Sequence, residues 1–541
     1  MNRNLFAALA VWLVIVIPGM ASDDSSIPHL VKKGTAKQLI VDGQPLLMLG
    51  GELHNSSSSS LDYMKPIWPE LRAMNLNTVV TPVSWELIEP EEGKFDFTLV
   101  DGLIRGAREN HLHLVFLWFG SWKNSMSSYA PEWVKTNEVR FPRAESSAGK
   151  GEEILSPFCD TNCAADANAF AALMKNIRDV DGRKHTVVMV QVENEIGMIP
   201  EARDHSAMAN VLFWGPVPDE LMNYLVQRRP SLIPEFLDAW EDAGFKISGT
   251  WTEVFGSKAE EIFMAWYFAQ YTDRVAAAGK AEYRLPMYVN TALNRPNAKP
   301  GQYPSGGPLP YLADIWRAGA PHIDFQSPDI YFQNFADWCA AYHRSGNPLF
   351  IPESRPVAAN LLYAVGQFDA MGVSPFGIED EYSAHPSDSP SVAQAYQLLS
   401  ELTPLILQNE GRGTMAGVWL DQSHPTQKVS LGGYTLNVAH DYTWAYSRGY
   451  GQTNNWPRMG GLIICNGPGD YLVAGCGMVI TFASNAKGKT AGILSIDEEH
   501  FANGQWIAGR RLNGDEDHQG RHVSMSPNEC SVQRLRLYSY Q

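Results

Sequence analysis

Positive charge is scarce in this chain. Its 541 residues include 42 lysines and arginines against 59 aspartates and glutamates, which gives a formal net charge of −17. Nucleic acids and anionic membranes bind basic patches, so this balance argues against a nucleic-acid or membrane partner. Neutral and cationic substrates remain compatible with the composition.

Cysteine is also rare, and its six residues form no zinc motif. Cys159 and Cys163 are separated by three residues with no histidine partner nearby, so we expect neither a structural metal nor a cofactor. In an exported protein these thiols could form disulfides. The local pairs Cys159–Cys163 and Cys465–Cys476 are the ones we predict, although six cysteines allow many other pairings.

Long apolar runs are confined to the start of the sequence. An uncharged stretch from Leu5 to Ile17 follows Arg3 and precedes the small residues of 19–21. This pattern is typical of a secretory signal, because a membrane span needs about 20 apolar residues. We therefore predict a signal peptide at 1–21 and export to the periplasm or beyond. A retained anchor is the alternative.

The sequence has no internal repeat and no low-complexity linker, but its texture changes near residue 410. Residues 22–410 alternate short apolar runs with segments of helical period, as βα units do. Residues 411–541 are rich in Gly, Thr, Ser and Asn, with short alternating stretches. The predicted fold class is α/β: a (β/α)8 TIM barrel over 22–410, followed by a C-terminal β-sandwich over 411–541.

Eight segments are predicted as barrel strands. The first ends a hairpin that turns at Asp42-Gly43 and runs on toward Glu52. The other seven lie at 77–85, 112–119, 186–195, 285–291, 323–332, 348–353 and 372–379. An extra short strand is possible at 246–252. Helices are expected at 61–75, 98–110, 166–180, 218–228, 232–243, 259–278 and 390–409.

Two of these strands end in a carboxylate. The apolar run that starts at Thr186 ends on Asn194-Glu195, and the run at 348–353 ends on Glu353. Catalytic groups of α/β barrels lie at the carboxyl ends of the strands, and a pair of carboxylates suits glycoside hydrolysis. Glu195 could instead be a helix-start residue that stabilises a helix dipole.

Glu193 is a competitor for the role of Glu195. Strand alternation predicts that both side chains lie on the same face, with Glu193 one layer deeper in the barrel. A deeper carboxyl group is less able to reach a substrate, so we favour Glu195. Glu193 would then need a buried partner, such as an arginine.

Three motifs resemble glycoside hydrolase family 35, the β-galactosidases. Trp85-Glu-Leu-Ile-Glu-Pro-Glu-Glu-Gly-Lys-Phe-Asp-Phe97 is similar to the second-strand signature of that family, Gly50-Gly-Glu-Leu-His54 to its first strand, and Gln191-Val-Glu-Asn-Glu-Ile-Gly197 to its acid/base strand. The likeness covers about 40–200 well and the rest of the barrel loosely. Pro82, the segment 117–122 and the surroundings of Glu353 depart from the family pattern, which leaves sugar specificity open.

The resemblance implies a retaining exo-β-galactosidase that removes terminal galactosyl residues from plant cell-wall oligosaccharides such as xyloglucan fragments. Glu195 would be the acid/base and Glu353 the nucleophile. Asn194 matches the residue that binds the sugar 2-hydroxyl, and Tyr331 the tyrosine that hydrogen-bonds the nucleophile. An ordinary turn asparagine and a core tyrosine are the structural alternatives.

Further substrate contacts are expected from aromatic and polar side chains at strand ends. Sugar rings stack on tryptophan, although most tryptophans are simply packed in cores. Arg355 could orient Glu353 or lie on the surface, and His54 ranks low because buried histidines usually have structural partners. The candidate substrate-binding residues are Glu52, Trp85, Trp122 and Trp251, with Trp118 and Trp133 as further stacking candidates.

Two rival functions remain at this stage. One is a retaining β-glycosidase for another sugar, such as a β-glucoside or an arabinopyranoside. The other is a carbohydrate-binding protein without hydrolytic activity, against which the two strand-end glutamates argue.

Overall fold

The computed structural model describes residues 27–383, 390–447, 449–502 and 505–541. The predicted signal peptide at 1–21 lies outside the described residues. Within the described part of the chain, no helix combines the length and apolar character needed to cross a bilayer.

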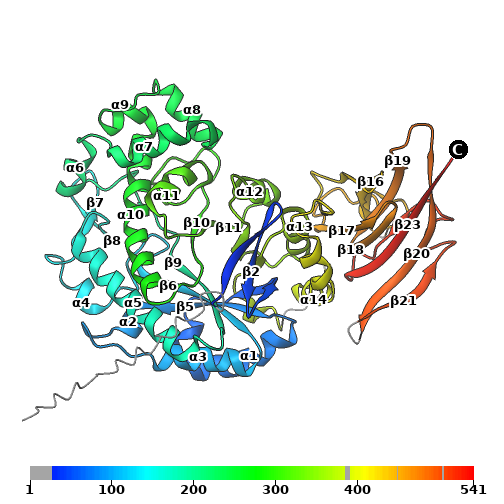
Figure 1. Cartoon of the computed structure of the whole chain (residues 1–541), viewed down its shortest axis with the longest axis horizontal. Coiled ribbons are helices and arrows are strands. Elements are labelled where there is room, and N and C mark those ends of the chain that lie inside the picture. The colour runs from blue at the N-terminus through cyan, green and yellow to red at the C-terminus, as the bar shows by residue number, and fades with distance from the viewer. Residues whose placement is uncertain (1–26, 384–389, 448, 503–504) are drawn as a thin grey trace, which may run out of the picture.

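The larger part of the molecule is a closed barrel of eight parallel strands surrounded by helices, as predicted (Figure 1). Each strand is followed by a helix on the outside of the barrel, which is the (β/α)8 pattern. In chain order the strands are β4 (Met48–Glu52), β5 (Thr78–Ser84), β6 (His113–Lys123), β9 (Val187–Asn194), β10 (Met287–Ala292), β11 (Phe325–Ile330), β12 (Phe350–Ser354) and β13 (Gly372–Pro375).

The barrel interior is a packed core rather than a channel. Apolar side chains from most of the strands fill it, and they belong to one cluster that includes Val80, Val115, Leu117, Val188 and Phe350. A small antiparallel sheet of β1 (His29–Lys33), β2 (Ala36–Val41) and β3 (Gln44–Leu46) adds two side chains, Leu39 and Val41, to this cluster. Polar groups are therefore left for the carboxyl ends of the strands.

The helices that cover the barrel are α1 (Leu61–Ala73), α3 (Thr98–Glu109), α5 (Asp160–Asp181), α10 (Ala259–Glu282), α11 (Ala313–Gly319), α12 (Phe335–Tyr342), α13 (Ala358–Phe368) and α14 (Val392–Asn409). Short helices α2 (Trp85–Ile88) and α4 (Glu132–Lys135) lie in loops after strands β5 and β6. The long excursion after β9 folds into α6 (Ala207–Phe213), α7 (Asp219–Arg228), α8 (Pro234–Asp242) and α9 (Trp251–Phe255), which gather at one side of the barrel (Figure 1).

The extra strand considered at 246–252 does not form. This segment makes one isolated bridge, between Thr250 and Pro216, and then enters α9. Thr250 caps that helix, because its side chain accepts from the backbone N–H of Glu253 while the Glu253 carboxylate accepts from Thr250. The capping sequence therefore favours a helix over a strand at this point of the chain.

Two antiparallel sheets form the C-terminal part. One has the order β14 (Met415–Leu420), β17 (Met459–Gly467), β18 (Asp470–Cys476), β23 (Ser531–Tyr540), β20 (Thr490–Ala502) and β21 (Gln505–Leu512). The other has the order β15 (Thr426–Leu431), β16 (Tyr434–His440), β19 (Met478–Ser484) and β22 (Val523–Ser524). Side chains from both sheets share one apolar cluster, as in a sandwich.

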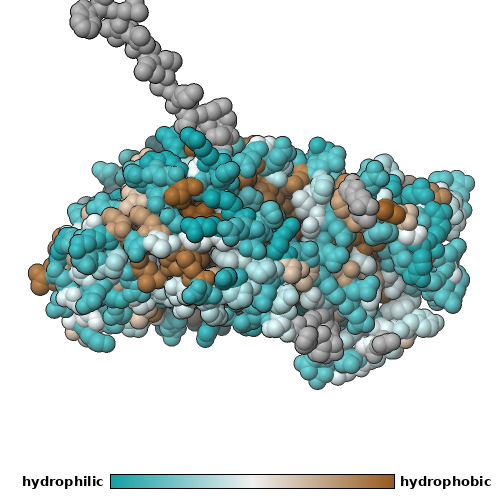
Figure 2. Space-filling model, turned by 90° about the horizontal axis from the view of Figure 1, so that it is seen from below, coloured by the Kyte–Doolittle hydropathy of each residue, from teal (hydrophilic) through white to brown (hydrophobic). Residues whose placement is uncertain are grey.

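The sandwich is packed directly on the barrel. A Cβ at Gly366 of α13 would lie 2.5 Å from Leu462, so this glycine lets the helix approach the sheet closely. Asn360 of the same helix accepts a hydrogen bond from the Trp419 indole at 3.0 Å. The surface in Figure 2 is largely hydrophilic, with hydrophobic residues gathered in separate patches.

Neither predicted disulfide is present, because all six cysteines are free thiols. Cys465 lies opposite Tyr471 and Cys476 opposite Gly460 on the β17–β18 hairpin, which keeps the two sulfurs apart. Cys163 is buried within α5 and directs its thiol at the Tyr271 carbonyl rather than at Cys159. Sequence proximity was a poor guide to sulfur geometry here.

Candidate active site

Three carboxyl groups meet at the carboxyl ends of the barrel strands. Oxygens of Glu195, Asp329 and Glu353 all lie within 4.8 Å of one another. Asp329 and Glu353 are register partners on the adjacent strands β11 and β12, and both are buried. Glu195 follows β9 and is only partly buried. The prediction that Glu195 and Glu353 face each other is therefore confirmed.

The backbone at the end of β9 is bent where Glu195 enters the site. Glu193 and Glu195 both have left-handed φ values, 61° and 45°, which are uncommon for residues other than glycine. Asn290 on β10 holds this bend, because its side-chain oxygen accepts from the Glu195 backbone N–H at 2.9 Å. The Asn290 amide also donates to Asp329 at 2.6 Å. One asparagine thus positions two of the three carboxyl residues.

Glu353 is oriented by Tyr331, as the sequence predicted. The tyrosine hydroxyl donates to Glu353 Oε1. Arg355 donates from Nε to the backbone carbonyl of Tyr331 at 2.9 Å, and no described hydrogen bond joins it to Glu353. Of the two alternatives for Arg355, the surface position is confirmed, because this residue is exposed.

Glu52 and Lys123 complete the polar lining. Glu52 ends β4, is almost completely buried, and leaves its Oε1 without a hydrogen-bond partner. Lys123 ends β6 and donates to the side-chain oxygen of Asn194 at 3.0 Å. Its positive charge lowers the pKa of both Glu52 and Glu195. Lys123 is therefore a cation placed among several acids.

Burial dominates the ionisation of these acids. Burial, followed by repulsion from Glu353, raises the pKa of Glu195 to about 7. The same two causes, in the same order, hold the pKa of Glu52 and of Asp329 well above the ordinary carboxyl range. A carboxyl group that titrates near neutral pH can both donate and accept a proton, which is what acid/base catalysis requires.

Strand alternation predicted that Glu193 lies below Glu195 in the barrel, and this prediction is wrong. Its Oε2 accepts from the backbone N–H of Trp122 at 2.7 Å, and its carboxyl group is close to that of Asp166 on α5. The left-handed φ at Glu193 breaks the alternation of the strand. Among the described residues no arginine pairs with Glu193, and burial followed by repulsion from Asp166 holds its pKa well above the ordinary range.

The structure contradicts the predicted substrate-binding role of three tryptophans. Trp85, Trp122 and Trp251 are fully buried, so none has a face available to a sugar. The Trp85 indole donates to Glu89, that of Trp122 donates to the Leu155 carbonyl, and Trp251 packs against the aromatic rings of Phe255, Phe263 and Tyr267.

Two weaker stacking candidates also have structural partners. Trp118 is buried and donates to Asp166, and Trp133 donates to the Glu89 carbonyl. His54, ranked low in the sequence, contacts Asp380 at 2.9 Å. Asn194 and Glu52 do lie beside the carboxyl cluster, and their role in substrate binding stays a prediction.

Sequence reasoning missed Asp329, Asn290 and Lys123. Asp329 and Asn290 lie near the carboxyl ends of predicted strands, whereas Lys123 lies four residues beyond the predicted strand at 112–119, because β6 extends to Lys123. Their polar side chains at or just beyond the strand ends are the signal in the sequence that points to them.

Two of the three carboxyl groups of the cluster accept hydrogen bonds within the protein: Asp329 accepts from Asn290, and Glu353 accepts from Tyr331.

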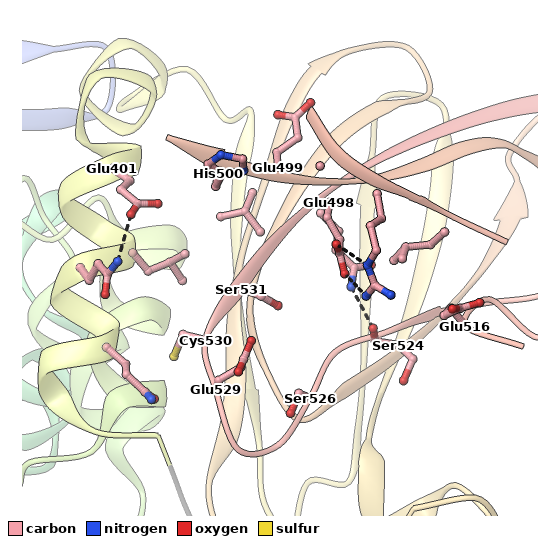
Figure 3. Close-up of a pocket in the computed structure, with 18 residues that line it drawn as sticks. Glu401, Glu498, Glu499, His500, Glu516, Ser524, Ser526, Glu529, Cys530 and Ser531 are labelled. Atoms are coloured by element: carbon pink, nitrogen blue, oxygen red, sulfur yellow. Dashed lines mark hydrogen bonds and ion pairs between the residues drawn. The ribbon is translucent and has the colours of Figure 1, made fainter. Parts of the chain in front are cut away.

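A cavity of about 850 Å³ lies elsewhere, between α14 and the C-terminal sheets (Figure 3). Its labelled acidic residues come from both parts: Glu401 from α14, and Glu498, Glu499, Glu516 and Glu529 from the C-terminal part. No residue of the carboxyl cluster lines it.

Comparison with known proteins gives matches in both parts of the chain. The family model for glycosyl hydrolases family 35 matches residues 38–140, which include β4, β5 and β6. A model for a domain of unknown function, DUF5597, matches residues 392–524.

The relatives found carry the name β-galactosidase. One from Xanthomonas manihotis is 28% identical over 218 residues, which are 39% of this chain and 33% of that protein. β-Galactosidase 14 of Arabidopsis thaliana is 33% identical over 96 residues, 16% of this chain and 10% of that protein. A solved β-galactosidase structure from Bacillus circulans sp. alkalophilus has a TM-score of 0.43 and 10% identity, covering 90% of this chain and 99% of that one.

The aligned region thus spans a third or less of the length of these two relatives. The family match falls on the segment that contains the first two predicted motifs, ending at Glu52–His54 and at Phe97. The family model and the two named relatives confirm the resemblance of the chain to glycoside hydrolase family 35.

Proposed function

We propose that this protein is a retaining exo-β-galactosidase. The observation that carries the proposal is the approach of the Glu195 and Glu353 carboxyl oxygens to within 4.8 Å. Retaining glycosidases place their two carboxyl groups about 5–5.5 Å apart, whereas inverting enzymes need about 6.5–9.5 Å to admit a water molecule. The names of the relatives support galactose as the sugar.

In the first step Glu353 attacks the anomeric carbon while the bond to the leaving oxygen breaks. Glu195 transfers its proton to that oxygen, so the leaving group departs as a neutral alcohol. The hydroxyl of Tyr331 holds Glu353 in one orientation for the attack. The pKa of Glu195, about 7, leaves a substantial protonated fraction at neutral pH.

In the second step water replaces Glu353 at the anomeric carbon. Glu195, now ionised, takes a proton from that water, and the ester bond to Glu353 breaks. Esterification has removed the negative charge of Glu353, one of the two causes that raise the pKa of Glu195. The pKa of Glu195 therefore falls, which favours its ionised form, and this carboxylate can act as the base.

The finer proposal concerns the substrate: terminal β-D-galactosyl residues of plant cell-wall oligosaccharides such as xyloglucan fragments. A neutral sugar fits a site lined by Glu52, Glu195, Asp329 and Glu353, because an anionic sugar would be repelled. The net charge of −17 favours the same class of substrate.

Proton NMR of the first sugar released from nitrophenyl β-galactoside tests the mechanism. The proposal expects the β-anomer to appear first and then mutarotate. Initial formation of the α-anomer would show inversion. Assays on the β-glucoside and the arabinopyranoside separate the rival sugars, and no turnover of any glycoside would leave the carbohydrate-binding alternative.

We also propose that the protein is exported, from the signal-like sequence at 1–21. Expression in a bacterial host with separation of periplasm and cytosol checks this. Mass spectrometry of the periplasmic product should show cleavage near Ala21, whereas an uncleaved cytosolic product would contradict it.

A further inference from the structure

Asp329 is a buried acid beside the proposed acid/base residue. Only 2% of its surface is exposed, and its Oδ2 accepts from the Asn290 amide at 2.6 Å. Its other oxygen, Oδ1, accepts from no N–H or O–H group that the structure describes. A carboxyl oxygen of Glu195 lies within 4.8 Å of a carboxyl oxygen of Asp329.

Two carboxyl groups can form a hydrogen bond only when one of them carries a proton, because an ionised carboxylate has no donor. Asp329 is the more deeply buried of the two. A buried charge without a counter-ion is more costly than a buried neutral acid. The proton between the two groups therefore belongs on Asp329, and Oδ1 is the oxygen free to hold it.

We propose that Asp329 is a positioning residue that stays protonated through the catalytic cycle and donates a hydrogen bond to Glu195. The effect of Asp329 on catalysis rests on the proposed retaining mechanism, whereas the protonation of Asp329 does not depend on that mechanism. Asn290 fixes the arrangement, since it binds the Asp329 side chain and the Glu195 backbone together.

The hydrogen bond stabilises Glu195 in its ionised form. It lowers the pKa of Glu195, against burial and Glu353, which raise it. Glu195 has to be ionised when it accepts a proton from water, so the donor helps the second step. A neutral donor achieves this without adding another negative charge to a crowded site.

The charges around Asp329 all oppose its ionisation. The titratable groups that face it are Glu52 at the end of β4, Glu195 after β9, Tyr288 on β10, Tyr331 after β11, Tyr342 of α12 and Glu353 on β12. Lys123 on β6 lowers the pKa of Glu52 and Glu195 instead. Burial and the three glutamates together hold the pKa of Asp329 well above its ordinary range.

Infrared difference spectroscopy tests the protonation directly. At pH 8, the spectrum of the full-length wild type minus that of Asp329→Asn should show the C=O stretch of a protonated carboxyl group. Asp324→Asn is the matched control, because Asp324 is ion-paired with Lys280 at 2.7 Å and should give a carboxylate difference only. A carboxylate band lost in Asp329→Asn would overturn the proposal.

The pH dependence of kcat/KM tests the role of Asp329 as a hydrogen-bond donor to Glu195. The basic limb reports the acid form of Glu195, expected near pH 7 in the wild type. Asparagine keeps a donor, so Asp329→Asn should leave this limb within about 0.5 pH unit, with kcat a few-fold lower. Asp329→Ala removes the donor, which should move the limb to higher pH and lower kcat by about tenfold or more.

The outcomes separate the inference from the proposed function. If Asp329 were ionised, Asp329→Asn would remove a negative neighbour and move the basic limb to lower pH, which would refute the inference while leaving the glycosidase intact. If the wild type hydrolysed no glycoside, the proposed function would fail, and the infrared band would still decide whether Asp329 is protonated.

Discussion

Acidic side chains are stabilised in opposite ways at the barrel mouth and in the six-stranded sheet of the C-terminal part. At the mouth, Glu52 and Asp329 are buried without a directly bonded cation, and burial holds the pKa of each far above its ordinary range. On β20, Asp497 and Glu498 are paired with Arg511 and Arg510 of β21, and these hydrogen bonds lower the pKa of both carboxyl groups.

The difference lies in what surrounds the carboxyl group. An arginine can satisfy a carboxylate with two parallel hydrogen bonds, as Arg511 does for Asp497, and the pair then stays charged at the surface. The mouth has Lys123 against several acids, so protons must neutralise part of the cluster. Proton exchange is a useful property in a site that performs acid/base chemistry. The predictions below test this contrast.

Replacement of Glu353 should have the largest effect. Glu353→Gln removes the nucleophile, so kcat on a β-galactoside should fall by on the order of 10⁴-fold or more. The unfolding midpoint should be unchanged or higher, because the variant relieves repulsion within the cluster. Residual activity above about one per cent of wild type, in a folded protein, would contradict the assignment.

Glu195→Ala should show an effect that depends on the leaving group. The loss of general acid catalysis should reduce turnover of a galactosyl disaccharide by about 10²- to 10⁴-fold. A dinitrophenyl galactoside needs no proton for its leaving group, so its first step should be nearly as fast as in the wild type and the glycosyl-enzyme should accumulate. Equal losses on both substrates would rule out the acid role.

Tyr331→Phe should have an intermediate effect. It removes one hydrogen bond to Glu353 and little volume, so kcat/KM should fall by about tenfold. Steady-state kinetics measure this, and Tyr342→Phe is a control, since that hydroxyl donates to the Pro308 carbonyl at 2.9 Å rather than to the cluster. A comparable loss in the control would point to packing instead.

The stability of the fold should fall as pH rises. Glu52, Asp329, Glu193 and Glu195 have raised pKa values in the folded state, so the folded protein holds more protons than the unfolded one above about pH 4.5. Thermal unfolding midpoints should therefore decline from pH 5 to pH 8. Glu52→Gln removes one of these groups and should make the decline shallower; an unchanged slope would contradict the account.

The smallest effect is expected from the carboxylates of β20 that are paired with arginines. Asp497→Asn breaks an ion pair with Arg511, whose side chain is 62% exposed, and ion pairs at the protein surface contribute little to stability. Activity and the unfolding midpoint at pH 7 should both match the wild type. A clear loss of stability would show that the six-stranded sheet depends on this ion pair more than the exposure of Arg511 suggests.

The barrel and the meeting of Glu195 with Glu353 were predictable from sequence. Each lies where a buried apolar strand turns polar, and the carboxyl ends of parallel strands converge on one face. The pairing of Tyr331 with Glu353 followed from the family resemblance.

Other features depend on contacts that the sequence does not reveal. Trp251 is covered by Phe263 and Tyr267 of α10, which only the folded excursion brings to it. The outward turn of Glu193 depends on a left-handed φ at a residue that is not glycine. Asp329 lies inside a strand with no flanking motif, and its importance comes from Glu195, 134 residues earlier in the chain.

Trapping of the covalent intermediate tests the central claim most directly. A 2-deoxy-2-fluoro-β-galactoside with a dinitrophenyl leaving group should inactivate the enzyme, and peptide mass spectrometry should find the fluorogalactosyl group on Glu353 alone. Label on another residue, or steady turnover with no covalent adduct, would contradict the assignment of Glu353 as the nucleophile opposite Glu195.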